Sequence, residues 1–328
     1  MNIICGLRKL CLRGSRHERR SRSRLWLTTR EGPMTKHNSM RNSARSCATA
    51  FAGSPRAFTL VELLVVIALI ALVLSLVFPA VRSMRNRSAQ VREMSAARAI
   101  FSAWSEYSHD NGGRLLPGYK NGLAAFDEKG QSIAAQTIGV AAARYPWRLA
   151  PYLAFNFRGL YLDQNLRTLE ELEASDYPNY LYQTSAYPSL GLNTTWVGGD
   201  ENQGGFNPAY QSAFGRFYVT RESEILHPDR LIVSASSRGI DPTAGADAPM
   251  REGYFRVRSP NFTEAQWAAK YDANEAASCG QVASRNGDRT VVGFAGGHVE
   301  SKAIDELRDM RFWADRADAP DWKLTPLP

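Results

Sequence analysis

The chain has 328 residues and a formal net charge of +8, and 44% of its residues are hydrophobic. Residues 1–57 hold 13 of the 40 basic residues but two of the 32 acidic ones, so 27 basic and 30 acidic residues remain in 58–328. That larger part shows no basic patch interleaved with aromatic residues, which argues against nucleic acid as a partner. Cys279 is its only cysteine, so it has no internal disulfide or Cys-pair metal site. We interpret Cys279 as a packed side chain, with a reactive thiol as the alternative.

Residues 1–57 have the character of a basic leader that is removed, and we exclude them from the fold. Their charge favours a cytoplasmic N-terminus, because positively charged flanks stay on that side of a membrane. Met34 and Met40 are in frame, and we expect the true start at one of them. A disordered N-terminal extension is the alternative.

An apolar stretch follows at 58–79, with the sequence FTLVELLVVIALIALVLSLVFP. Its first 21 residues contain one charge, Glu62. About 20 apolar residues in a helix span the ~30 Å core of a bilayer, and only a helix can do so alone. The sequence therefore predicts a transmembrane helix. An ionisable residue inside such a helix is costly and points to a function.

The residues from Arg56 to Leu64, RAFTLVELL, resemble the class III signal peptide of type IV pilins and type II secretion pseudopilins. The resemblance implies that a prepilin peptidase cuts between Ala57 and Phe58 and that Phe58 is then N-methylated. Counted from Phe58, Glu62 is the fifth mature residue and Pro79 the twenty-second, as is common in that family. The chain departs from the pattern at Ala57, where the family usually has Gly.

Glu62 has two interpretations. As a residue near the membrane interface, its carboxylate could simply snorkel toward water. Cleavage before Phe58 also creates an α-amine in the apolar zone, and opposite charges attract strongly where the dielectric constant is low. The two groups are poorly placed to meet within one straight helix, so we expect the amine of a neighbouring subunit to pair with Glu62. This assembly role derives mostly from the resemblance.

The helical pattern continues beyond Pro79, which should kink the helix. Apolar residues recur every three or four positions, which indicates an amphipathic helix over 80–113 that ends at the signal His109–Gly113; they are Val91, Met94, Ala97, Phe101 and Trp104. This stripe is interpreted as the packing face for the C-terminal domain, with a coiled-coil seam as the alternative.

Residues 114–328 are long enough for one α+β domain with its own core. We predict helices at 145–153 and 166–172, loops at 191–208 and 237–253, and strands at 217–219, 230–233 and 254–258. Two further strands, 289–294 and 298–300, flank Gly296-Gly297 and predict a hairpin. A helix at 303–312 and a loosely held tail at 319–328 complete the domain.

The hairpin carries a second, partial resemblance. Many pseudopilin-like proteins have an Asp in this turn and a His ten residues before it. Here Gly296 and Asn286 occupy those two positions. The role of that His/Asp pair is therefore not transferred to this chain.

Candidate sites for chemistry are few. The three histidines outside residues 1–57 lack metal-ligand spacing and are interpreted as structural or surface residues; they are His109, His227 and His298. The sequence contains no nucleophile elbow, phosphate loop or dinucleotide fingerprint. Acidic residues near the C-terminus are interpreted as a solvated face, with calcium as a weaker possibility; they are Asp305, Asp309, Asp315, Asp318 and Asp321.

Together these features predict a pilin-like α+β protein: a long N-terminal helix, transmembrane over 58–79, packed on an antiparallel sheet domain with long loops. The resemblance implies a non-enzymatic subunit of a type II secretion or type IV pilus-like filament in the bacterial inner membrane, with its C-terminal domain in the periplasm. Its implied partners are the prepilin peptidase, other subunits, the assembly platform with its ATPase, and the lipid bilayer. The alternatives are a membrane-anchored extracytoplasmic binding domain and an ordinary secreted protein.

Overall fold

A computed structural model describes residues 58–137, 139–161, 163–240, 248–285 and 287–328. The chain divides by its contacts into Met1–Thr59 and Leu60–Pro328, and the second unit contains all the elements below. The predicted leader and Ala57 lie outside the described residues, as does Asn286.

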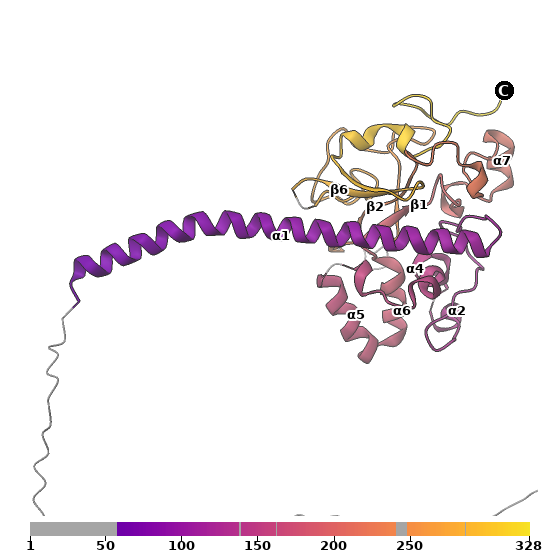
Figure 1. The fold of residues 1–328 in the computed structure, drawn as a ribbon. Coiled ribbons are helices and arrows are strands. Elements are labelled where there is room, and N and C mark those ends of the chain that lie inside the picture. The colour runs from indigo at the N-terminus through magenta and orange to yellow at the C-terminus, as the bar shows by residue number, and fades with distance from the viewer. Residues whose placement is uncertain (1–57, 138, 162, 241–247, 286) are drawn as a thin grey trace, which may run out of the picture. The chain divides into compact units, whose positions relative to one another are not determined.

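Helix α1 (Leu60–Asp110, 51 residues) is the longest element, at about 77 Å for a rise of ~1.5 Å per residue. It ends as the sequence predicts, because Gly112 and Gly113 take φ of 63° and 77°. The Gly113 amide then donates to the Ser108 carbonyl at 2.8 Å, which closes the last turn. The helix runs unbroken through Pro79 and curves gently in its N-terminal part (Figure 1). A local kink at Pro79 stays a prediction.

Only the C-terminal half of α1 is buried, and its buried residues share one face; they are Glu93, Ala96, Ala97, Ile100, Ala103, Trp104 and Ser108. The predicted stripe is right at Ala97 and Trp104 but wrong at Val91, which is exposed. The predicted stripe omits Ala96 and Ala103, because small side chains carry little periodic signal. This face contacts β6 (Thr290–Phe294) and β2 (Ile232–Ser236) of the sheet, so it is a packing face.

The main sheet has the strand order β5-β1-β2-β6-β7. All neighbours are antiparallel except β1 and β5, which run parallel with Leu192 opposite Arg256. A separate two-stranded sheet pairs β3 with β4. The strands are β1 (Leu190–Asn193), β2 (Ile232–Ser236), β3 (Arg238–Ile240), β4 (Met250–Glu252), β5 (Arg256–Val257), β6 (Thr290–Phe294) and β7 (Val299–Lys302).

Short helices cover the side of α1 opposite the sheet, so the C-terminal half of α1 lies between the two layers (Figure 1). The α-helices are α2 (Ile133–Gln136), α3 (Val140–Ala143), α4 (Tyr145–Leu149), α5 (Asp163–Ser175), α6 (Tyr177–Ala186) and α7 (Pro208–Phe214). The 3-10 helices are η1 (Ala150–Leu153), η2 (Arg158–Leu160), η3 (Glu201–Gln203), η4 (Glu222–Glu224), η5 (Glu306–Arg308) and η6 (Met310–Phe312).

Two apolar clusters lie on the two faces of the main sheet. Val291 joins the cluster that contains α1, whereas its neighbour Val292 joins the cluster under the C-terminal segment. This division follows from strand geometry, because successive side chains point to opposite faces. Strands β2 and β6 are buried along their whole length, and the buried Ser236 hydroxyl accepts the Val291 amide at 2.9 Å.

Several sequence predictions of helices and strands are confirmed. Helices α4 and η1 fill the predicted 145–153, and α5 contains the predicted 166–172. The hairpin of β6 and β7 forms with Gly297 at φ 91°, and the Phe294 amide donates to the His298 carbonyl at 3.1 Å.

Other predictions of local structure are wrong or right only in part. Residues 217–219 form no strand and make one bridge, between Val219 and Val197. The predicted loop 191–208 overlaps β1 and η3, but residues 194–200 and 204–207 are irregular as predicted, and 194–200 are buried. Gly198 shows how tightly that stretch packs, since a Cβ there would lie 1.9 Å from the Leu116 carbonyl oxygen. The predicted loop 237–253 contains β3 and β4.

The C-terminal segment also differs from expectation. The predicted helix 303–312 is two 3-10 helices, η5 and η6; three-residue apolar spacing matches the 3.0-residue period of that helix. The tail is anchored, because the Leu324 amide donates to the Phe262 carbonyl at 2.8 Å and the Leu327 amide to the Ala213 carbonyl at 2.7 Å.

Candidate functional site

The start of α1 carries the predicted site residues. Phe58 is 72% exposed and precedes the helix, which begins at Leu60. Glu62 lies in the first turn of α1. A carboxylate there interacts favourably with the positive end of the helix dipole. In the sequence, Phe58 is two residues before the start of α1 and four residues before Glu62.

The apolar half of α1 is uncovered. Every large apolar side chain from Leu60 to Phe78 is exposed, whereas a soluble protein rarely exposes so large an apolar patch. In the described part of the chain, α1 is the one helix long and apolar enough to cross a membrane. A core helix of a soluble protein would be buried along this stretch. This surface therefore needs lipid or other subunits around it.

A buried ion pair anchors the other half of α1. Glu93 pairs with the guanidinium of Arg285, which also bonds Glu252 at 2.7 Å and the Ser189 carbonyl at 3.3 Å. The Glu93 side chain is 1% exposed. Buried charges need such partners, since an unpaired one is very costly. Sequence reasoning missed this contact, although Glu93 is the single acid between Glu62 and Glu106.

The three histidines lie on separate elements. His109 is in the last turn of α1. His227, in the loop before β2, has its Nδ1 3.5 Å from a carboxylate oxygen of Asp315. His298 stacks on the Phe294 ring with 4.4 Å between centroids, in the hairpin. His227 and His298 thus contact protein groups and His109 is exposed, and the fold does not bring these three side chains into one site.

The C-terminal acids differ in exposure: Asp305, Asp318 and Asp321 are exposed, as a solvated face predicts, whereas Asp309 and Asp315 contact protein groups. Asp309 pairs with Arg311 at 2.6 Å, and this hydrogen bond holds the pKa of Asp309 below its usual value. Asp315 is buried, against the expectation of a solvated face, and accepts the Leu226 and His227 amides at 2.7 and 2.9 Å. No three His, Cys, Asp or Glu side chains among the described residues are grouped to hold a metal ion.

Cys279 is fully buried, as interpreted from sequence. Burial raises the pKa of its thiol, although the nearby Arg308 and Arg238 act in the opposite direction. A thiolate is the reactive form of cysteine, so the folded protein keeps Cys279 unreactive.

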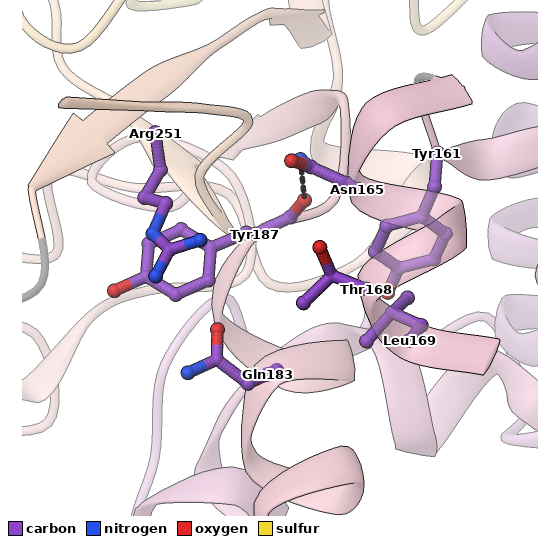
Figure 2. Close-up of a pocket in the computed structure, with 7 residues that line it drawn as sticks. All are labelled: Tyr161, Asn165, Thr168, Leu169, Gln183, Tyr187 and Arg251. Carbon is purple, nitrogen blue, oxygen red and sulfur yellow. Dashed lines mark hydrogen bonds between the residues drawn. The ribbon is translucent and has the colours of Figure 1, made fainter. Parts of the chain in front are cut away.

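The described part of the body has several hollows. A pocket between α5, α6 and β4 has Arg251 over the Tyr187 ring, while Asn165 donates to the Tyr187 carbonyl at 3.3 Å (Figure 2). Its volume of about 10 Å³ holds little more than one water molecule. A larger groove of about 430 Å³ runs between α1 and η2, lined by Ala96, Arg158 and their neighbours. Two further hollows, of about 370 Å³ beside Ala134 and about 340 Å³ beside Arg216, are also large enough for a small ligand, and the groove is the largest of the three.

Comparison with known proteins identifies the N-terminal signal. Residues 54–78 match the family model described as the prokaryotic N-terminal methylation motif. The chain therefore carries the prepilin-type signal of pseudopilins and type IV pilins, and its long apolar helix on an antiparallel-rich sheet has a pilin-like α+β architecture. The match covers the signal and the apolar part of α1 and does not reach the body. No curated protein and no solved structure matches the chain.

Proposed function

We propose that this protein is a structural subunit of a type II secretion or type IV pilus-like filament. The observation that carries the proposal is the exposed apolar half of α1 directly behind a prepilin-type signal. Such a surface fits two successive environments, the bilayer before assembly and the helices of neighbouring subunits afterwards. A helix needs no side-chain change to move between them, because lipid and packed helices are both apolar.

The proposed processing follows from the signal. A prepilin peptidase cuts between Ala57 and Phe58 and methylates the new amine of Phe58. Residues 58–79 span the inner membrane, 80–113 continue the helix, and 114–328 form the periplasmic body. The platform and its ATPase supply the force for assembly, as the sequence contains no phosphate-binding loop.

Glu62 has the assembly role. The Phe58 amine of an incoming subunit pairs with Glu62 of a subunit already in the filament. Each charge alone is costly in an apolar medium, so the pair forms at one axial register. A helical filament requires a fixed axial register between neighbouring subunits, in addition to affinity between them.

The mature N-terminus tests the proposal. The chain is expressed with a prepilin peptidase, extracted from membranes, and its N-terminal peptide is measured by mass spectrometry. We expect a start at N-methylated Phe58. Ala57→Gly should be cut at least as well, whereas the bulky Ala57→Leu should remain uncut. A mature start beyond Phe78 would contradict the proposal and indicate an ordinary secreted protein.

The groove beside α1 favours a second candidate function, a membrane-anchored binding domain that uses the same signal. The two candidates differ in their dependence on Glu62. A filament subunit needs Glu62 for assembly, whereas a binding domain would keep its ligand affinity without it.

A further inference from the structure

A short basic segment separates the apolar run from the body. We call residues 79–92 of α1 the stalk and its first three arginines, Arg82, Arg85 and Arg87, the collar. All three collar side chains are exposed. The sequence has no Asp or Glu from residue 63 to residue 92, so no acid one turn away on the helix can neutralise them.

If the apolar run fills the membrane core, the collar starts within the lipid head-group layer at Arg82 and continues just beyond it to Arg87. Residues 58–78 are about 31 Å long as a helix, which matches the ~30 Å core. Arg82, Arg85 and Arg87 then lie about 6, 10 and 13 Å beyond Phe78 along the axis. The head-group layer is about 5–8 Å thick on each side, and long arginine side chains reach back toward it.

The collar points in several directions around the helix. At about 100° per residue, Arg85 lies about 60° from Arg82, and Arg87 lies about 160° from Arg85 on the far side. A docked protein would contact one face of a lone helix. Lipid head groups surround a membrane helix on all faces, so the angular spread favours lipid over protein as the partner.

The body does not account for these charges. The first buried residue of α1 is Glu93, and the buried face starts there. Arg87 is six residues before it, or about 9 Å along the axis. The collar thus lies between the membrane boundary and the region where the body covers α1.

We propose that the collar binds the phosphate groups of anionic phospholipids in the extracytoplasmic leaflet. The proposal rests on the membrane placement in the proposed function. A guanidinium presents a planar fork of donors that matches a phosphate and stays charged. Each juxtamembrane arginine contributes about fivefold to association with an anionic surface. The collar fixes the depth of the unassembled subunit, and these contacts must break when the subunit leaves for the filament.

The test measures which lipids surround the helix. Full-length mature protein is reconstituted in phosphatidylcholine vesicles with trace spin-labelled phosphatidylglycerol or spin-labelled phosphatidylcholine. Electron spin resonance gives the motionally restricted fraction of each label. The collar variant carries Arg82→Gln, Arg85→Gln and Arg87→Gln. The control carries Arg98→Gln, Arg167→Gln and Arg316→Gln, three exposed arginines with the same loss of charge.

We expect the wild type and the control to enrich phosphatidylglycerol several-fold over phosphatidylcholine, in a salt-sensitive way. The collar variant should show no preference. Three outcomes would contradict lipid binding by the collar. The collar variant could keep the preference, the wild type could show none, or the control could lose it equally. If the wild type shows no lipid preference but forms crosslinked oligomers that the collar variant does not form, the collar binds a second copy of the chain and the lipid proposal is wrong.

A separate measurement distinguishes this failure from failure of the proposed function. Alkaline carbonate extraction reports whether the protein is integral to the vesicles. Extraction into the soluble fraction would contradict the membrane placement, and the collar with it. An integral protein without a lipid preference would contradict the collar alone.

Discussion

Glu62 is one carboxylate within 21 otherwise uncharged residues. Every neighbouring large side chain of the run is apolar and exposed. Replacing Glu62 by an apolar residue would make membrane insertion more favourable, although the helix dipole favours a carboxylate in the first turn. Under the proposed function, Glu62 is retained for the assembled state, in which a positive charge is brought to it.

Glu62→Ala is therefore expected to leave insertion and cleavage intact and to impair assembly. Removing one member of a buried ion pair costs about 3–5 kcal/mol. At ~1.4 kcal/mol per tenfold, this shifts an assembly equilibrium by more than a hundredfold. Filament recovery after overexpression, or crosslinking of subunits in membranes, measures the effect.

Glu62→Gln is the matched variant, because it keeps a hydrogen-bond acceptor without the charge. Its assembly should fall between wild type and Glu62→Ala. Wild-type assembly by Glu62→Ala would show that the charge-register mechanism is wrong and would favour the binding-domain alternative.

Cys279 should resist thiol reagents in the folded protein. Its side chain is buried and its raised pKa keeps it protonated. Alkylation by iodoacetamide, followed by mass spectrometry, should be slow in buffer and rapid in denaturant. The control is Ser175→Cys at the exposed end of α5, which should react in both conditions. Equally rapid alkylation of both cysteines in buffer would contradict the burial.

At the scale of elements, the attachment of α1 depends on the Glu93–Arg285 pair. Glu93→Ala leaves the Arg285 guanidinium with Glu252 as its one carboxylate partner and should lower the free energy of unfolding by about 1.5–3 kcal/mol. Glu93→Gln should cost less, since it retains an acceptor. The measurement is urea unfolding of the detergent-solubilised chain followed by tryptophan fluorescence.

The exposed Glu106, thirteen residues further along α1, provides the control for Glu93. Glu106→Ala should change stability by less than about 0.5 kcal/mol, as surface substitutions usually do. Equal effects of the two substitutions would show that the ion pair contributes nothing specific.

Asp127, in the loop before α2, should make the free energy of unfolding fall at acidic pH. Asp127 accepts the Lys129 and Gln131 amides at 3.0 and 2.8 Å and the Tyr177 hydroxyl at 3.0 Å. Burial alone would raise the pKa of Asp127, but these hydrogen bonds outweigh it and lower the pKa below 3.8. The unfolded state then binds the proton more tightly. The stabilisation is complete above the unfolded pKa of about 3.9 and is lost as the pH falls through the folded value.

Asp127→Asn should therefore destabilise the protein by about 1–2 kcal/mol at neutral pH and by little at acidic pH. Urea unfolding at a series of pH values measures the difference between variant and wild type. A difference that stays constant down to the lowest pH would show that the carboxylate charge is not the cause.

The sequence predicts the fold correctly in segments where apolar residues recur with one clear period or where one residue type prevails. The long helix, its end at Gly112 and Gly113, and the β6–β7 hairpin follow from local signals. It failed where long-range contacts decide. Strand β1 contains Gly191, which packs against the Arg256 backbone, and no local signal reveals that. The candidate site around Phe58 and Glu62 could be predicted from sequence, because a processing signal is recognised as a continuous segment of the chain.

At the scale of the whole molecule, α1 belongs to two environments. Its C-terminal half lies between the sheet and the short helices, whereas its N-terminal half has no body around it. The body completes its two apolar clusters without residues 58–79. Folding of the body and membrane insertion are thus separable, as a subunit that transfers from membrane to filament requires.

Residues 80–328 should accordingly be soluble and folded without the apolar run. The buried face of α1 begins at Glu93 and is retained in this fragment. The remaining exposed stalk is basic rather than apolar, so it should not cause aggregation. Size-exclusion chromatography without detergent should give a monomer, and urea unfolding should give one cooperative transition. A control fragment that starts at residue 100 removes Glu93, Ala96 and Ala97 from the core and should be unstable or aggregated. If 80–328 needed detergent, or if the two fragments were equally stable, the division of α1 into a lipid half and a body half would be wrong.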